Sequence, residues 1–184
     1  FQDEDLIGVE MGVAYGGSVE TLGKAWKGRG KVYGYDTFEG MPKHLAGYGT
    51  REANCLDPFY EQYGTDKLSY DYIRGELDEL GLDNVHLIKG LIDKDSCKDL
   101  TAIHYCLLDL DILASMQAGY EAVKDKIVPG GYLCMHDVCG RWPFASLVPW
   151  YQEVKSDPRW KVEFEGYGEM LAILKRVDDS PVEK

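Results

Sequence analysis

Short apolar runs followed by polar, glycine-containing turns recur along the chain, and they predict buried strands that alternate with amphipathic helices. The first apolar run covers residues 6–11 and leads into a glycine-rich segment. Further strands are expected at 31–36, 84–90, 103–108 and 132–137, and helices at 18–27, 69–80, 115–126 and 144–156. The last strands, 161–166 and 169–176, are separated by so few residues that they must form an antiparallel hairpin.

This order of elements predicts an α/β fold, a doubly wound, seven-stranded, mostly parallel Rossmann-like sheet with a C-terminal antiparallel hairpin. With 184 residues, of which 45% are hydrophobic, the chain can bury one core. Residues 1–177 are therefore expected to form a single domain, followed by a polar tail at 178–184. The segment 37–68 is rich in Gly, Pro and Tyr and is expected to be a substrate flap, with a well-packed surface loop as the alternative.

The segment Gly8–Ser18, GVEMGVAYGGS, has the pattern of a buried strand that leads into a glycine-rich turn and a helix capped by Ser18. Such a turn presents backbone N–H groups and the positive end of a helix dipole to a ligand. The dinucleotide spacing G-x-G-x-x-G is absent, and Glu10 would repel a pyrophosphate. A cofactor with a cationic amino group and a ribose fits better, and S-adenosylmethionine (SAM) is the common one. A plain turn is the alternative.

Asp36 ends the next strand, roughly 20 residues beyond the glycine turn, where nucleotide-binding folds place the acid that accepts the ribose hydroxyls. Capping of the following turn is the alternative role for this residue. The segment Leu91–Asp95 follows the strand at 84–90, so it falls at the same edge of the sheet, where an adenine would lie.

Acidic residues also follow two later strands of the predicted sheet. Asp109 and Asp111 come after the strand at 103–108, and His136 and Asp137 end the strand at 132–137. The expected topology brings these strand ends together. Converging carboxylates raise each other's pKa, and a divalent cation would offset their repulsion. Taken singly, Asp109 could instead be a helix N-cap and His136 a core histidine.

Four strings in this order resemble the macrocin O-methyltransferase (TylF/MycF-like) family of class I SAM-dependent enzymes: GVEMGVAYGGS, YDTFEGMP (35–42), LLDLDILAS (107–115) and PGGYLCMHD (129–137). They are more distantly similar to catechol O-methyltransferases. The resemblance covers roughly residues 6–138, and the DTFEGMP string is its most specific part. It implies metal-dependent transfer of a methyl group from SAM to a hydroxyl, commonly on a sugar or natural product.

The residues and the resemblance together assign a candidate site. The expected cofactor contacts are Glu10, Gly12, Gly16, Ser18, Asp36, Thr37, Gly90, Ile92 and Asp109. Mg²⁺ or Mn²⁺ would be held by Asp109, His136 and Asp137, and the expected catalytic residues are Asp109, Asp111 and His136, with Asp111 or His136 as the base. Relatives usually carry two acids or an Asp-Asn pair at 136 and 137, and often a Tyr at 113, so His136 and Leu113 are departures.

The sequence leaves other functions open. A metal-independent methyltransferase with His136 as general base, a non-catalytic cofactor-binding homologue and a hydroxylase with the same fold are alternatives. A nicotinamide enzyme is disfavoured by the missing G-x-G-x-x-G spacing.

Charge and cysteine content narrow the expected partners and location. The formal net charge of -12 would repel a phosphate backbone, so a small hydroxylated acceptor is expected rather than nucleic acid or membrane. Five cysteines without a C-x-x-C pair indicate reduced core thiols. No apolar run approaches membrane-spanning length and no signal peptide is visible, so a cytoplasmic location is expected. The oligomeric state is left open, a homo-oligomer included.

Overall fold

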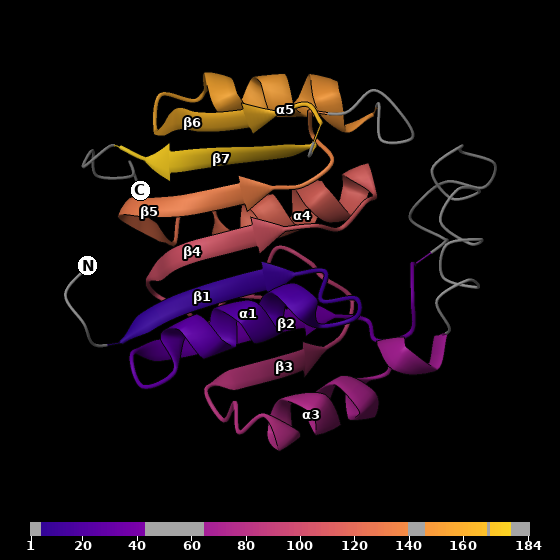
Figure 1. Cartoon of the computed structure of the whole chain (residues 1–184). Helices are drawn as coiled ribbons and strands as arrows, with labels where there is room; N and C mark the ends of the chain where they lie inside the picture. Colours follow the sequence, from indigo (N-terminus) through magenta and orange to yellow (C-terminus); the bar gives the residue numbers. More distant parts are fainter. Residues whose placement is uncertain (1–4, 43–64, 140–145, 169, 178–184) are drawn as a thin grey trace. The chain divides into compact units, whose positions relative to one another are not determined.

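The computed structural model describes residues 5–42, 65–139, 146–168 and 170–177 of the chain (Figure 1). The chain folds as two compact units, the first ending at Ile92 and the second beginning at Asp93. Its seven strands belong to a mixed, mostly parallel sheet that ends in an antiparallel hairpin, which confirms the fold class expected from the sequence.

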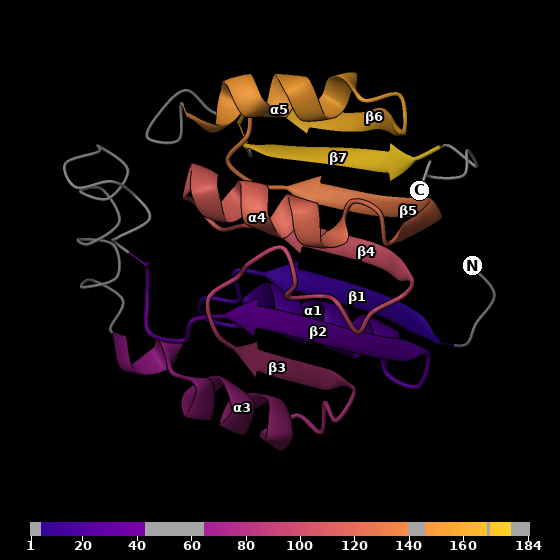
Figure 2. The same ribbon diagram turned by 180° about the vertical axis from the view of Figure 1, so that it is seen from behind.

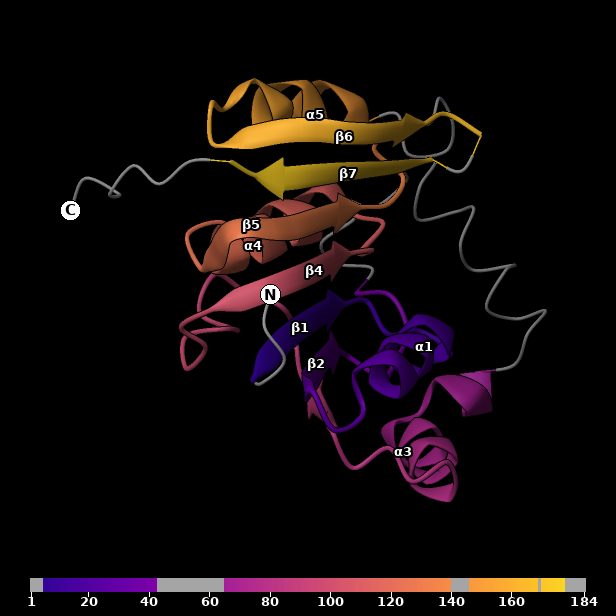
Figure 3. The same cartoon turned by 60° about the vertical axis from the view of Figure 1, so that its left-hand side comes forward.

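The described residues of the first unit form three parallel strands with two α-helices on one face (Figure 3). The strands are β1 (Leu6–Met11), β2 (Gly30–Asp36) and β3 (Val85–Lys89), in the order β3-β2-β1. The register pairs Leu6 with Gly30 and Asp36 with Lys89. Helices α1 (Gly17–Trp26) and α3 (Tyr70–Glu79) lie on the same side of β1 and β2 in Figure 3, and the short 3-10 helix η1 (Thr65–Leu68) precedes α3.

The core of the first unit lies between these helices and the strands. Its buried members come from the glycine turn, both helices, the strands and the turn after β2: Val13, Val19, Val32, Phe38, Ile73, Leu77, Leu82 and Val85. In α3, Ile73 and Leu77 are one helical turn apart and share the buried face. The apolar pattern of residues 69–80 also predicts Tyr72 and Leu80 on that face, but 41% and 43% of their surfaces are exposed. This prediction was wrong because Tyr72 lies about 100° around the helix from Ile73, and because Leu80 is the C-cap residue, just beyond the helix.

The ends of α3 follow local chemistry that the sequence contains. The helix begins after Ser69, whose hydroxyl accepts a hydrogen bond from the backbone N–H of Tyr72 at 3.3 Å. It ends at Glu79, and Gly81, just beyond the C-cap Leu80, has a φ of +64° and so provides the left-handed residue that follows many helices.

In the second unit, the part of the chain that the structure describes forms four strands with two α-helices on one face (Figure 2). The strands are β4 (Ile103–Leu108), β5 (Ile127–Met135), β6 (Trp160–Gly166) and β7 (Leu171–Arg176), in the order β4-β5-β7-β6. Strand β7 is antiparallel to both β5 and β6, as the arrows in Figure 3 show. Helices α4 (Leu113–Val123) and α5 (Leu147–Ser156) lie in front of these strands in Figure 2 and behind them in Figure 1.

Side-chain hydrogen bonds hold these helices to the hairpin. The indole N–H of Trp160 donates to the hydroxyl of Tyr120 at 3.0 Å. Glu165 accepts hydrogen bonds from the Tyr151 hydroxyl at 2.7 Å and from the Lys155 ammonium at 2.8 Å. Both bonds join α5 to β6, and they hold the pKa of Glu165 below its usual range.

The boundaries around Pro129 differ from the prediction. Helix α4 ends at Val123 rather than near Lys126, and β5 begins at Ile127 and passes through Pro129. Proline lacks an N–H for the strand ladder, which normally confines it to strand starts and irregularities. Here it lies near the start of β5, where the register against β4 shifts between Ile103 and Tyr105.

Several expectations fall partly or wholly outside the described residues: most of the flap, Cys55, the start of the helix at 144–156 and the tail at 178–184. The other four cysteines are buried and not disulfide-bonded, as expected for core thiols. Within the described ranges, no helix is long and apolar enough to cross a membrane. The single-domain organisation and the cytoplasmic location stay predictions.

Candidate active site

The glycine-rich turn between β1 and α1 is built from backbone conformations that glycine favours. Gly12 has a φ of +97° and donates its N–H to the carbonyl of Tyr35 at 2.9 Å, which ties the turn to β2. Gly16 has a φ of +82° and is the N-cap of α1, without a side-chain cap. A Cβ added at Gly17 would meet no atom within 4 Å. The side of the first turn at Gly17 is therefore open, and the N–H groups of this turn are candidates to bind a ligand.

Asp36 lies beside this turn and braces it. Its Oδ2 accepts a hydrogen bond from the N–H of Ala14 at 3.0 Å, and its Oδ1 accepts one from the N–H of Phe38 at 2.8 Å. The predicted ribose ligand thus also has the alternative role, since it caps the turn that follows β2. A carboxylate has about four lone-pair sites, so these two bonds leave capacity for ribose hydroxyls.

The helix cap predicted at Ser18 was wrong. Helix α1 begins one residue earlier, and the Ser18 hydroxyl donates instead to Oε1 of Glu10 at 2.6 Å. Glu10 is only 1% exposed. A buried carboxylate requires hydrogen-bond donors, and this requirement takes the serine side chain away from the helix end.

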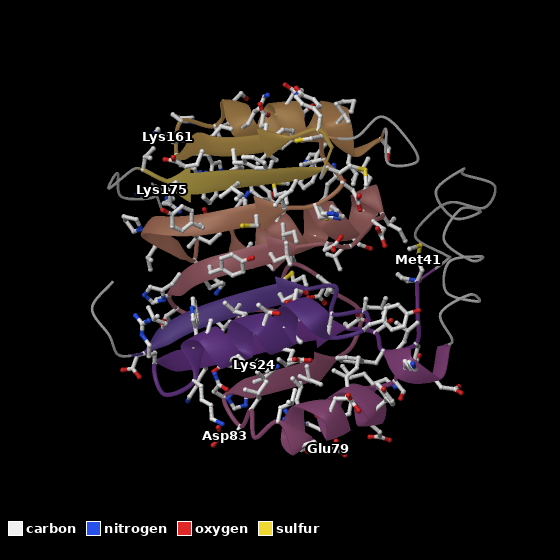
Figure 4. The ribbon with its side chains drawn as sticks, viewed as in Figure 1. Lys24, Met41, Glu79, Asp83, Lys161 and Lys175 are labelled. Atoms are coloured by element: carbon white, nitrogen blue, oxygen red, sulfur yellow. The ribbon has the colours of Figure 1, made fainter. Side chains whose placement is uncertain are left out.

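An open groove in the first unit is lined by three residues of the expected cofactor site, Thr37, Gly90 and Leu91. The groove has a volume of about 600 Å³ and is lined by Thr37, Glu39, Gly40, Met41, Pro42, Lys89, Gly90 and Leu91. Gly90 donates its N–H to the carbonyl of Asp36 at 2.9 Å, which joins the ends of β2 and β3. Met41, labelled in Figure 4, lies on the side toward which β1 and β3 point. Ile92 follows Leu91 and is half-buried, but it does not line this groove.

Three predicted metal ligands converge in the second unit. Asp109 follows β4, and His136 and Asp137 follow β5. Nδ1 of His136 lies 3.1 Å from Oδ1 of Asp109 and 3.2 Å from Oδ2 of Asp137. One ligand atom from each residue lies within 4.8 Å of the others, a spacing that allows all three to hold a metal ion. The N–H of His136 donates to the carbonyl of Leu108 at 2.9 Å and fixes the two strand ends together.

The charges of this cluster are strongly coupled. Hydrogen bonds to Asp109 and then to Asp137 raise the pKa of His136 to about 10. Between these two acids the imidazole therefore carries a proton at neutral pH. A protonated imidazole has no lone pair to accept a further proton, so this arrangement does not favour a metal-independent base at neutral pH.

Asp111 completes the acidic group. Although the residue is partly exposed, its carboxyl group is largely withdrawn from water, and this desolvation raises its pKa well above the usual range. The negative charges of Asp109 and Asp137 raise it further, and the carboxyl lies within hydrogen-bond reach of Asp137. A carboxyl group can donate to a carboxylate only by keeping its proton, so Asp111 is the member of the group that most readily holds one.

Two features mark Asp137 as unusual. The residue is 2% exposed, and its Oδ1 is buried without a hydrogen-bond donor among the described residues. Its φ is +63° and that of Asp111 is +59°, so both acids adopt the left-handed conformation that most side chains avoid. A buried carboxylate oxygen without a donor is costly, and such strain concentrates at functional sites.

Comparison with known proteins identifies the family. The family model described as macrocin-O-methyltransferase (TylF) matches residues 3–157. The chain belongs to the macrocin O-methyltransferase family. This membership confirms the resemblance of the four sequence strings and makes the chain a SAM-dependent methyltransferase. No match was found among curated protein sequences.

Solved structures agree with the family at the level of the fold. The O-methyltransferase NovP superposes with a TM-score of 0.73 at 20% identity, over 95% of this chain and 72% of NovP. An rRNA methylase from Streptococcus thermophilus has a TM-score of 0.60 at 18% identity, over 96% of this chain and 89% of that one. SMU.1697c from Streptococcus mutans, solved with S-adenosylhomocysteine (SAH), has a TM-score of 0.60 at 13% identity, over 95% of this chain and 90% of that one.

Within each unit of this macrocin O-methyltransferase family member, the structure groups most of the candidate residues as expected. Asp36, Thr37 and Gly90 meet in the first unit, and Asp109, Asp111, His136 and Asp137 meet in the second. Sequence reasoning missed Phe38, Glu39, Met41 and Lys89, of which the last three line the groove. Three of these four lie in the DTFEGMP string, whose specificity was the available signal.

Proposed function

We propose that this protein transfers the methyl group of SAM to a hydroxyl of a small molecule, such as a sugar or natural product, and requires a divalent metal ion. The observation that carries the proposal is the cluster of Asp109, His136 and Asp137, whose ligand atoms lie within 4.8 Å of one another. Family membership supplies the class of reaction, and this cluster supports the metal dependence.

The first unit would hold the cofactor. SAM supplies a methyl group that is already activated on a sulfonium. Asp36 would accept hydrogen bonds from the ribose hydroxyls while Ala14 and Phe38 keep its carboxylate in place. The open N-terminus of α1 would bind the carboxylate of the methionine end, and Gly90 and Leu91 would border the adenine in the groove. Each of these contacts uses a group that the apo protein already orients, which lowers the entropic cost of binding.

The residues of the second unit fit a divalent cation. Asp109 and Asp137 offer hard oxygen ligands, and the buried Oδ1 of Asp137 without a donor is an atom that a cation would satisfy. His136 offers an imidazole nitrogen, which tilts the preference from Mg²⁺ toward Mn²⁺ and other ions that accept nitrogen ligands. A divalent ion held here would lower the pKa of the acceptor hydroxyl and orient it.

The protein's remaining task is to take up the proton that the hydroxyl loses. With His136 among the metal ligands, Asp111 is the acidic side chain of this group that is not needed as a ligand. We assign it the role of proton acceptor in the metal-bound protein. A cation beside Asp109 and Asp137 would offset the negative charges that help to raise the pKa of Asp111, so that its carboxyl could give up the proton that it holds without metal. Positioning of the hydroxyl and of the activated methyl would supply much of the remaining rate enhancement.

The overall charge supports a small acceptor. A net charge of -12 opposes binding of an RNA backbone, although one protein of similar fold is described as an rRNA methylase. A neutral hydroxylated molecule encounters no such repulsion.

The test is calorimetric titration of Mn²⁺ and Mg²⁺ into the apo protein, followed by assays of methyl transfer from labelled SAM to a panel of sugars and catechols. We expect Mn²⁺ to bind the wild type and to bind Asp109→Ala at least tenfold more weakly. Asp99→Ala is the matched control, because Asp99 is exposed in the same unit. Methyl transfer that persists fully in EDTA would overturn the metal dependence and favour the metal-independent alternative.

A further inference from the structure

Phe38, in the turn after β2, has an unusual combination of conformation and burial. Its φ is +53°, a left-handed conformation that is a genuine outlier for a bulky side chain. The side chain is nevertheless 4% exposed and belongs to the core cluster of the first unit. A strained backbone persists only where surrounding contacts determine it, so the packing of this ring must hold the turn in place.

The ring joins the turn to the supports of the glycine loop. It meets the ring of Tyr70 edge-on, with the centroids 5.3 Å apart, at the start of α3. Val13 of the glycine loop and Ile73 of α3 belong to the same buried cluster. Ile73 also bounds the loop, because a Cβ added at Gly16 would lie 3.0 Å from its Cγ2. The aromatic ring and the loop therefore share one packed support.

The backbone of Phe38 acts on the candidate ribose ligand. Its N–H donates to Oδ1 of Asp36 at 2.8 Å, while the other oxygen of that carboxylate accepts from Ala14 in the loop. Thr37 closes the same turn, because its hydroxyl donates to the carbonyl of Gly40 at 2.6 Å. Displacement of the Phe38 backbone would release one of the two backbone hydrogen bonds that orient the carboxylate.

We propose that Phe38 is a positioning residue for the cofactor: its buried ring locks the turn that orients the Asp36 carboxylate and, through it, the glycine loop. This inference rests on the proposed cofactor site and assigns to the phenylalanine of the DTFEGMP string a role beyond core packing. Phe38 itself need not touch the cofactor.

Leu82 provides the matched control. It belongs to the same core cluster and is 1% exposed, so its truncation also removes buried apolar surface. It lies next to Asp83, which Figure 4 shows at the opposite end of the first unit from Met41. Its backbone N–H bonds to Leu77, and no hydrogen bond joins it to Asp36 or the loop among the described residues.

The first measurement is the dissociation constant of SAH for wild type, Phe38→Leu, Phe38→Ala and Leu82→Ala, by calorimetry at a temperature where all are folded. We expect about a tenfold weakening in Phe38→Ala and a smaller one in Phe38→Leu, because misplacement of a positioned group costs up to about a hundredfold. Leu82→Ala should bind within about twofold of the wild type despite its lower melting temperature. If Phe38→Ala does not fold, Phe38→Leu and Leu82→Val provide the same comparison.

The second measurement is hydrogen exchange in the protein without cofactor. We expect Phe38→Ala to accelerate exchange of the amides at residues 12–16, whereas Leu82→Ala leaves their rates unchanged. Equal SAH affinity in wild type and both Phe38 variants would overturn the positioning role, and so would equal weakening by the Leu82 variant. Failure of the wild-type protein to bind SAH would instead overturn the proposed cofactor site itself.

Discussion

The two groups of candidate residues differ in how their carboxylate oxygens are hydrogen-bonded. In the first unit, the carboxylate of Asp36 accepts two backbone hydrogen bonds, and the buried Glu10 accepts one from Ser18. In the second unit, Asp109, Asp111 and Asp137 surround one histidine, and a buried oxygen of Asp137 accepts no hydrogen bond from the described residues. The carboxylates of the first group thus have hydrogen-bond donors, whereas one carboxylate oxygen of the second group has none among the described residues.

This difference fits the roles that we propose for the two groups. Preorganised acceptors with satisfied hydrogen bonds suit a site that binds a neutral ribose and must not change shape. Converging carboxylates, of which Asp111 has a raised pKa, suit a site that is completed by a cation. The proton that His136 holds between two acids offsets part of their charge when no metal ion is bound.

Removal of the Asp137 carboxylate should have the largest effect of the variants considered, and the effect should be on metal binding. We expect Asp137→Ala to reduce Mn²⁺ affinity at least a hundredfold, because it removes a charged ligand. At Mn²⁺ concentrations of 100 times the wild-type dissociation constant, the metal should stabilise the wild type by about 2.7 kcal/mol and the variant hardly at all. Differential scanning calorimetry with and without EDTA measures this. Equal metal-induced stabilisation of both proteins would remove Asp137 from the ligand set.

Asp36→Ala tests the preorganised group. Loss of a charge-assisted hydrogen bond to the ribose should weaken SAH binding by about 1.5 to 3 kcal/mol, which is roughly 10- to 150-fold. Unlike Asp137→Ala, the variant should also melt earlier without ligand, because the N–H groups of Ala14 and Phe38 lose their acceptor. Isothermal titration with SAH measures the affinity, and Asp83→Ala is the control, because Asp83 is an exposed acid at the opposite end of the first unit from Met41 (Figure 4). Unchanged affinity in folded Asp36→Ala would exclude the ribose role.

Substitution of two adjacent glycines, Gly16 and Gly17, tests how rigid the glycine-rich loop is. Gly16→Ala should lower the free energy of unfolding by about 1 to 2 kcal/mol, because an L-residue at a φ of +82° is strained. Its Cβ would also lie 3.0 Å from the side chain of Ile73. Gly17→Ala has open space and should change stability by less than about 1 kcal/mol. Urea unfolding of both variants provides the comparison, and equal costs would show that the loop adapts to a side chain at either position.

The smallest expected effect concerns Glu165, an acid of the second unit whose carboxylate accepts hydrogen bonds from Lys155 and Tyr151. Lys155 and then Tyr151 lower its pKa, so its stabilisation is present above the ordinary value of 4.5 and is lost as the pH falls through the lowered value. Glu165→Gln should cost about 1 kcal/mol of unfolding free energy at pH 7, since the pair is partly exposed, and progressively less below pH 4.5. Urea titrations at several pH values check this. A cost that does not change with pH would mean that the charge of Glu165 contributes nothing.

The order of strands and helices and the residue types at each strand end follow from the amino-acid sequence alone. Apolar runs such as residues 6–11 and 103–108 identify buried strands because their side chains must leave water, whatever their neighbours are. The glycines of GVEMGVAYGGS and the acids after the strands at 31–36, 103–108 and 132–137 are local features too. Parallel strands put their carboxyl ends at one edge of a sheet, so the sequence alone assigns these residues to candidate sites.

The hydrogen-bond partner of each polar group, in contrast, depends on how the segments pack in three dimensions. Ser18 could have capped its own helix, but the buried Glu10, eight residues earlier, takes its hydroxyl. Asp36 proved to brace both the glycine loop and the turn at Phe38, and Asp137 proved to hold a buried oxygen without a donor. These outcomes depend on distances between residues remote in sequence and on which groups lose contact with water. Local propensity contains neither quantity, because both arise only when the segments pack together.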